Sequence, residues 1–133
     1  MGHHRYQVGF SGDVGGLTWS NLAYQPYFSA TAANVLFPSW SHDIEGDWAD
    51  LEMYTRWLQA GAYSGTMRSH ERGMSAGGCA DKAGTDPAAW GPTSGSCSII
   101  APWNVGPKFF EANRRVLQNR LKLVPYIYTA HRS

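Results

Sequence analysis

The chain has 133 residues, and its 11 Lys and Arg side chains nearly balance 10 Asp and Glu, which leaves a net charge of +1. This length suits one domain at most, and so small a charge supplies no field that would hold nucleic acid or an anionic membrane surface. No apolar run approaches the roughly 18 to 20 residues that cross a bilayer, and the first residues lack the apolar core of a signal peptide. We therefore expect an uncharged partner.

The N-terminal part predicts a strand, a helix and a second strand. The apolar patch Gln7–Phe10 stops at Ser-Gly-Asp, as a buried strand does at a functional loop. It has no polar lead-in, which is expected where a chain begins inside a domain. Apolar residues spaced by three and four predict a helix over Thr18–Val35, which Pro26 should kink. The apolar run Val35–Trp40 predicts the second strand, and a polar loop follows it.

The C-terminal part predicts two more helices and a third strand. Asp50–Ala62 has one apolar face and an acidic residue near its start, which favours a helix. A short strand is predicted over Ala62–Met67. Residues Glu71–Pro102 are rich in Gly, Ala, Ser and Pro and lack periodicity, so they form a long loop. Lys108–Leu123 is strongly helical, and Pro125 should kink or end that helix.

The order of these elements predicts an α/β fold. Strands that alternate with helices are typical of a doubly wound sheet or of a (β/α)8 barrel. Both architectures bind ligands at the carboxyl ends of the strands, where Asp13, Asp43, Arg68 and His70 would gather. Three strands cannot close a barrel, and a complete one takes about 250 residues. The chain would then be roughly half of a barrel, with unpaired strands at its edges.

Aromatic residues are plentiful, with six Trp and seven Tyr, and several lie beside glycines and polar residues. Aromatic faces stack on the C–H surfaces of sugar rings, while neighbouring polar side chains bond the hydroxyl groups. The distribution therefore suits a sugar site. Composition alone favours the alternative, an ordinary aromatic core.

Three motifs together resemble glycoside hydrolase family 31, the α-glucosidases and α-xylosidases. They are HRYQVGFSGD at His4–Asp13, WSHDIEGD at Trp40–Asp47 and MRSHE at Met67–Glu71. The stretch PWNVG at Pro102–Gly106, followed by LVPYIYTAHR, resembles the last barrel helix of that family. The resemblance implies a partial TIM (β/α)8 barrel of about the last three βα units. Residues 1–133 would be the C-terminal portion of the catalytic barrel, with a loop insertion at about 71–102.

The same resemblance implies a retaining hydrolase with two carboxylates about 5 to 5.5 Å apart. Asp13 matches the acid/base, which protonates the departing oxygen and later takes a proton from water. This role requires a protonated carboxyl near neutral pH, so the pKa of Asp13 should be raised by partial desolvation and by the charge of the nucleophile. The alternative for Asp13 is a carboxylate that caps the next helix.

The resemblance also implies substrate-binding residues. His70 and Arg68 match residues that hold the sugar next to the cleaved bond, and His70 would donate to a ring hydroxyl. Asp43 matches a carboxylate that lines the same pocket, although a purely structural ion pair with Arg68 is the alternative. Trp40 and Phe10 would form apolar walls, unless they are simply part of the core.

The nucleophile of the family is missing from this sequence. It belongs to a W-x-D-[ML]-[NG]-E motif on an earlier barrel strand, and neither that motif nor a sugar-binding Arg from the preceding strand occurs here. The chain alone is therefore predicted not to hydrolyse glycosides. Its partners would be an oligosaccharide or α-glucoside substrate and the missing N-terminal half of the barrel. The alternatives are a non-catalytic sugar-binding or structural remnant and a small α/β protein unrelated to carbohydrate.

Two departures from the family pattern stand near the predicted site: Glu45 replaces the usual Gly, and the loop after His70 is enlarged. The loop carries both cysteines, Cys79 and Cys97. A disulfide between them would stabilise the fold by about 3 kcal/mol in an oxidising compartment, and a reduced pair is equally compatible with the sequence. No pair of His or Cys has the spacing of zinc ligands, so neither a metal nor a cofactor is expected.

Overall fold

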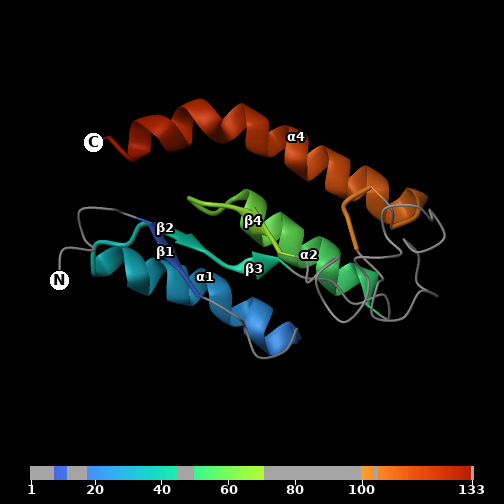
Figure 1. Ribbon diagram of the computed structural model, residues 1–133, viewed down its shortest axis with the longest axis horizontal. Helices are drawn as coiled ribbons and strands as arrows, with labels where there is room; N and C mark the ends of the chain where they lie inside the picture. Colours follow the sequence, from blue (N-terminus) through green and yellow to red (C-terminus); the bar gives the residue numbers. More distant parts are fainter. Residues whose placement is uncertain (1–7, 12–17, 45–49, 71–99, 104, 133) are drawn as a thin grey trace, which may run out of the picture.

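A computed structural model of the chain describes residues 8–11, 18–44, 50–70, 100–103 and 105–132. Within them the fold is mixed α/β. In chain order the elements are β1 (Val8–Phe10), α1 (Trp19–Asn34), β2 (Ser39–Ser41), β3 (Asp43–Ile44), α2 (Leu51–Ala62), β4 (Arg68–Ser69) and α4 (Pro107–Ala130). Figure 1 shows α1 and α4 on opposite sides, with the strands and α2 between them.

The strands pair in parallel. β1 pairs with β2, with Val8 opposite Ser39, and β3 pairs with β4, with Asp43 opposite Arg68. Only His42 separates β2 from β3, so the stretch 39–44 pairs first with β1 and then with β4. Parallel neighbours need a crossover connection, and α1 and α2 supply it. The predicted alternation of strands and helices is confirmed over this part of the chain.

The starts of α1 and α2 are fixed by side chains that cap them. The Thr18 hydroxyl accepts the Asn21 amide at 3.1 Å, and the Asp50 carboxylate accepts the Met53 amide at 2.9 Å. Each cap satisfies a backbone donor that the first helical turn leaves without a partner. Pro26 lies inside α1, and the helix continues through it to Asn34.

The core lies where α2 packs against β3, α4 and the segment before α4. Trp57 and Tyr54 are 1 % exposed and Leu58 is fully buried. The buried cluster consists of Ile44, Met53, Tyr54, Trp57, Leu58, Ala62, Ile100, Val105 and Val116. The apolar face predicted for the second helix is therefore the face that it buries.

Three predicted boundaries are wrong. The strand predicted over Val35–Trp40 is confined to Ser39–Ser41, because the cap of α1 and a turn occupy residues 35 and 36. α4 does not end at Pro125 but continues to Ala130, and a kink at Pro125 stays a prediction. The predicted strand over Ala62–Met67 is a turn that follows the last residue of α2, and the strand β4 begins only at Arg68. None of the helices in the described ranges combines the length and the apolar character that a membrane span needs.

Hydrogen bonds explain why residues 63–67 form a turn. The Ser64 hydroxyl contacts the carbonyl oxygens of Gly61 at 2.7 Å and of Thr66 at 2.5 Å. The guanidinium of Arg120, on α4, donates to the carbonyl oxygens of Ala62 at 3.2 Å and Gly65 at 3.0 Å, and also to that of Ser64. These carbonyl groups point to a side chain instead of to a neighbouring strand.

The same turn packs closely against the start of β2. A Cβ atom on Gly65 would lie 2.9 Å from the Cα atom of Ser39, so any larger residue would displace backbone. Burial lowers the pKa of the Arg120 guanidinium below its ordinary value, although an arginine remains charged at neutral pH. The Arg120 contacts thus join α4 to the turn that leads into β4.

Candidate functional site

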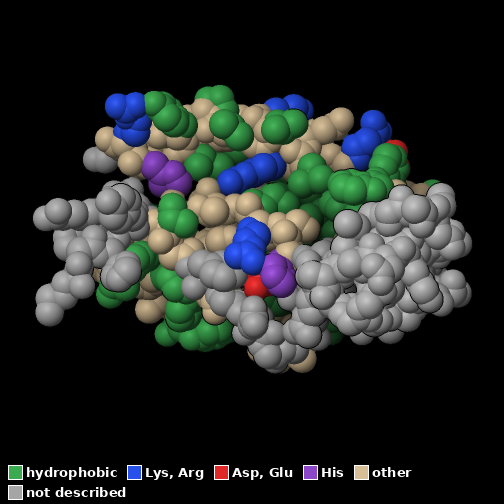
Figure 2. All heavy atoms as spheres, viewed as in Figure 1, with side chains coloured by type: hydrophobic (Ala, Val, Ile, Leu, Met, Phe, Trp, Pro, Cys, Tyr) green, Lys and Arg blue, Asp and Glu red, His purple; other side chains and the backbone are tan. Residues whose placement is uncertain are grey.

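An acidic, a basic and a histidine residue lie where β3 and β4 run side by side. Asp43 is 1 % exposed, and its Oδ1 lies 3.3 Å from Nε of Arg68. The His70 amide donates to the Ile44 carbonyl at 3.1 Å, which extends the pairing one residue beyond β4. Figure 2 shows side chains of these three kinds together on one face of the molecule. The fold therefore brings Asp43, Arg68 and His70 to one region.

The ion pair places a buried carboxylate beside a partly exposed cation. A carboxylate buried to this degree needs a charged or hydrogen-bonding partner, because water can no longer solvate it. The Arg68 side chain is 44 % exposed, so solvent screens the pair on that side. The Arg68 side chain is therefore accessible to a polar ligand, whereas the buried carboxylate of Asp43 fits the structural ion pair that the sequence analysis gave as the alternative.

Trp40 packs away from this ion pair. Alternate side chains of a strand point to opposite faces, and Trp40 contacts Phe28 of α1 and Phe37, with ring centroids 5.1 and 6.3 Å apart. Asp43 instead contacts Arg68 on β4. This geometry favours core packing over a role as an apolar wall beside Asp43.

His42 is a buried polar residue that the sequence analysis did not single out. Its ring is 8 % exposed, its Nε2 lies 3.4 Å from the Ser29 hydroxyl, and its centroid lies 6.3 Å from that of Trp57. Burial lowers the pKa of His42, and the neighbouring charge of Asp43 opposes part of that effect. The sequence did contain a signal for His42: neighbouring side chains of a strand point to opposite faces, so His42 was expected on the face opposite to that of Asp43.

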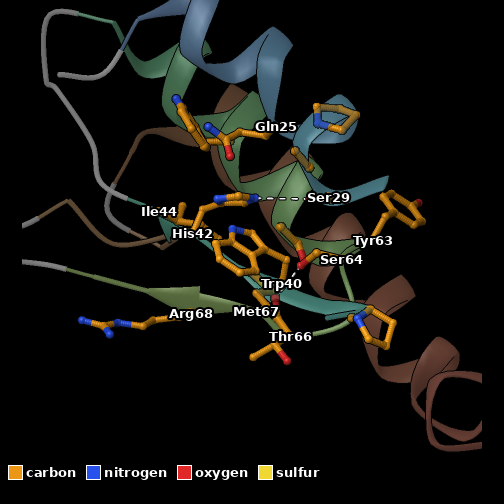
Figure 3. A pocket seen from close by; sticks show the side chains of 16 residues that line it. Gln25, Ser29, Trp40, His42, Ile44, Tyr63, Ser64, Thr66, Met67 and Arg68 are labelled. Atoms are coloured by element: carbon orange, nitrogen blue, oxygen red, sulfur yellow. Dashed lines mark hydrogen bonds between the residues drawn. The ribbon is translucent and has the colours of Figure 1, made fainter. Parts of the chain in front are cut away.

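His42 borders a cavity of about 360 Å³ between α1, α2, the strand at 39–44 and the turn that follows α2. Figure 3 shows His42 and Ser29 facing each other beside Trp40, whereas Arg68 points away from them. The cavity is lined mostly by apolar atoms and lies among the helices. Arg68 also lines the cavity, although its charged end points away from His42 and Ser29, so the cavity adjoins the ion pair of Asp43 and Arg68.

A family model described as the glycosyl hydrolases family 31 TIM-barrel domain matches residues 1–130. The chain belongs to glycosyl hydrolase family 31. No curated protein and no solved structure matches it. The resemblance drawn from the three motifs is thus confirmed at the level of the family. As their name says, the enzymes of this family hydrolyse glycosidic bonds.

The structure leaves Asp13 undescribed and describes Phe10 only in part. Asp13 lies outside the described residues, as do Glu45, Cys79 and Cys97. For Phe10 the backbone is described, opposite Ser41 in the pairing of β1 with β2, and its side chain is not. In the described ranges, no group of three or more His, Cys, Asp and Glu residues is placed to hold a metal ion.

His42 should make the stability of this family 31 chain depend on pH. Because its pKa in the folded chain lies below the ordinary value of 6.5, the unfolded chain binds a proton there that the folded chain does not. The free energy of unfolding should therefore be highest above pH 6.5 and fall as the pH drops toward the folded pKa. Each unit by which the pKa is lowered corresponds to about 1.4 kcal/mol.

The measurement is urea unfolding of the wild type and of His42→Gln at several pH values between about 5.5 and 7.5. Carboxylates contribute to the pH dependence of both proteins, so the difference between the two slopes reports His42. Identical slopes would show that the ring is equally easy to protonate in the folded and unfolded chains.

Proposed function

We propose that the chain is the C-terminal portion, about the last three βα units, of the catalytic barrel of a retaining α-glucosidase-like enzyme. The observation that best supports this reading is the ion pair of Asp43 and Arg68, with His70 close by, at neighbouring parallel strands of a family 31 chain. TIM-barrel enzymes bind their substrates at the carboxyl ends of such strands. Residues 71 to about 102 would then be an insertion in one of the loops at that end.

In this proposal Asp13 is the acid/base. Its carboxyl group gives a proton to the departing glycosidic oxygen while a second carboxylate attacks the anomeric carbon. Asp13 then takes a proton from the water that releases the sugar. Arg68 and His70 donate to sugar hydroxyls, and the buried carboxylate of Asp43 orients Arg68 through their ion pair. The attacking carboxylate comes from the N-terminal half of the barrel, which is the protein partner, and the substrate is an α-glucoside or oligosaccharide.

The test compares two proteins on a nitrophenyl α-glucoside. The 133-residue chain should release no nitrophenol, because it lacks the nucleophile and the first covalent step cannot occur. The same chain extended by the upstream coding region that carries the nucleophile motif should release it. Turnover by the 133-residue chain that disappears in Asp13→Asn would overturn the account of the missing nucleophile. An extended protein that binds glucosides without cleaving them would favour a non-catalytic remnant.

A further inference from the structure

The C-terminal end of α2 has backbone carbonyl groups that need partners from outside the helix. An α-helix cannot pair its last four carbonyl groups internally, and its dipole gives this end a partial negative charge. The carbonyls of Ala60 and Gly61 accept amides of the turn that follows, at 3.2 and 3.1 Å. The carbonyl of Ala62, the last residue of α2, accepts a hydrogen bond from Arg120. A cation from another helix therefore caps α2.

Arg120 also binds the turn itself, residues 63–67. One guanidinium nitrogen donates to the carbonyls of Ala62 and Ser64, and the other donates to that of Gly65 at 3.0 Å. The planar guanidinium presents its donors in a fixed arrangement, so one side chain can hold several carbonyl groups in a single geometry. In the described ranges, the hydrogen bonds that join this turn to an element other than α2 all come from Arg120.

The turn leads directly into the strand that carries the substrate-binding residues proposed above. Two residues separate Gly65 from Arg68, the first residue of β4. Arg68 lies opposite Asp43 in the parallel pairing, and the His70 amide donates to the Ile44 carbonyl at 3.1 Å. So short a connection cannot absorb a movement of the turn, and the movement would reach the strand.

The strand β4 has few contacts of its own. It consists of Arg68 and Ser69, and both residues are exposed. Its pairing with β3 covers the same two positions. Segments with little burial and few hydrogen bonds open easily, so their position depends on the backbone that leads into them. For β4 that backbone is the turn that Arg120 holds.

We propose that Arg120 is a positioning residue, which holds the turn at 63–67 so that Arg68 and His70 stand in the geometry that binds the substrate. The inference rests on the proposed function for the roles of Arg68 and His70. Arg120 acts on both through the backbone, because its guanidinium binds carbonyl groups that precede β4, whereas His70 follows it.

The first test measures amide hydrogen exchange in the 133-residue chain. Arg120→Ala should lower the protection of the His70 amide by about tenfold or more, because the strand before it is no longer held. The Ser11 amide is the internal reference. Like the His70 amide, it follows a short parallel strand and bonds a carbonyl of the stretch 39–44, but Arg120 does not bind the backbone that leads to it. Its protection should change by less than about twofold.

The second test measures maltose hydrolysis by the extended enzyme. Arg120→Ala should raise KM by about tenfold, because misplaced donors bind the sugar more weakly. Guanidinium ion at millimolar concentration should lower that KM again, since it can bind the same carbonyl groups. Arg120→Lys should lie between the wild type and Arg120→Ala, because an ammonium keeps the charge but not the planar arrangement of donors. If Arg120→Ala does not fold, Arg120→Lys serves for both tests.

Arg114→Ala is the matched control, because Arg114 is an exposed arginine on α4 that pairs with Glu111. It should change neither KM nor the protection of the His70 amide. Equal losses of protection at His70 and Ser11 would mean that the whole fold had loosened. A lower kcat with an unchanged KM would mean that part of the enzyme was unfolded. Either result would leave Arg120 with a purely structural role and overturn the proposal.

The proposed function fails on a different measurement, which is the hydrolysis of a nitrophenyl α-glucoside by the extended enzyme without substitutions. Hydrogen exchange in the 133-residue chain requires no activity. The two proposals can therefore fail separately.

Discussion

Asp13→Asn in the extended enzyme should lower kcat for maltose by about 10²- to 10⁴-fold, the range that general acid and base catalysis usually contributes. Asparagine keeps the shape of the side chain but can neither give nor take the proton. The loss should be smaller for the first step with a nitrophenyl glucoside, because the leaving group departs as the stable nitrophenolate anion and needs no proton. Steady-state rates with both substrates measure this difference.

Azide provides a second readout of the same role. It attacks the glycosyl-enzyme without the help of a general base, so it should restore turnover of the nitrophenyl glucoside by Asp13→Asn and form glucosyl azide. Glu111→Gln is the control, because that exposed carboxylate on α4 pairs with Arg114 at 2.8 Å and lies in no candidate site. Equal losses for the two variants, or no effect of azide, would remove Asp13 from the mechanism.

Trp57→Ala should lower the free energy of unfolding by about 3 to 5 kcal/mol. The Trp57 side chain is 1 % exposed in the cluster that joins α2 to β3 and α4, and the structure around it can close the resulting cavity only in part. A domain is usually stable by only about 5 to 15 kcal/mol, so the variant should be close to unfolding. Urea unfolding followed by circular dichroism measures the change.

Trp103→Ala is the matched control, because Trp103 is 73 % exposed and the same substitution should change stability by less than about 0.5 kcal/mol. Trp57→Phe should lie between the two, since it keeps one ring in the core. If both alanine variants unfolded at the same urea concentration, the cluster around Trp57 would not be the core of the folded chain.

Local patterns predicted the helices well where one face is buried. Asp50 stands at the start of α2 as both a favourable charge and a cap, and Trp57 and Leu58 recur on the face that packs. Such signals are contained within a few residues, so the sequence shows them. Thr18 is the corresponding example at the start of α1.

The wrong boundaries at residues 62–67 and at Pro125 depend on surroundings that a local pattern does not contain. The turn at 63–67 is held by Arg120, which is more than 50 positions away in the sequence. At Pro125 the helix loses one backbone hydrogen bond, but Leu121, four residues earlier, is 71 % exposed, so water can bond the carbonyl that is left without a partner. The helix can then continue to Ala130.

The part of the candidate site that lies at the ends of neighbouring strands was predictable from the sequence. Asp43 and Arg68 were expected near each other because they follow neighbouring strands, and they form an ion pair. The direction of Trp40 was not predictable in the same way, because a shift of one residue along a strand reverses the face on which a side chain lies. Its packing against Phe28 became evident only from the position of α1.

The contact between Arg120 and the turn before β4 also has a consequence for synthesis of the chain on the ribosome. Arg120 follows Ala62 by 58 positions, so Arg68 and His70 are translated well before the side chain that fixes the backbone leading to them. Arg120 follows His70 by 50 positions, so at a usual elongation rate this delay is about 2.5 to 10 s. The nascent protein therefore contains Arg68 and His70 for several seconds before the backbone that leads to them can be held in its final arrangement.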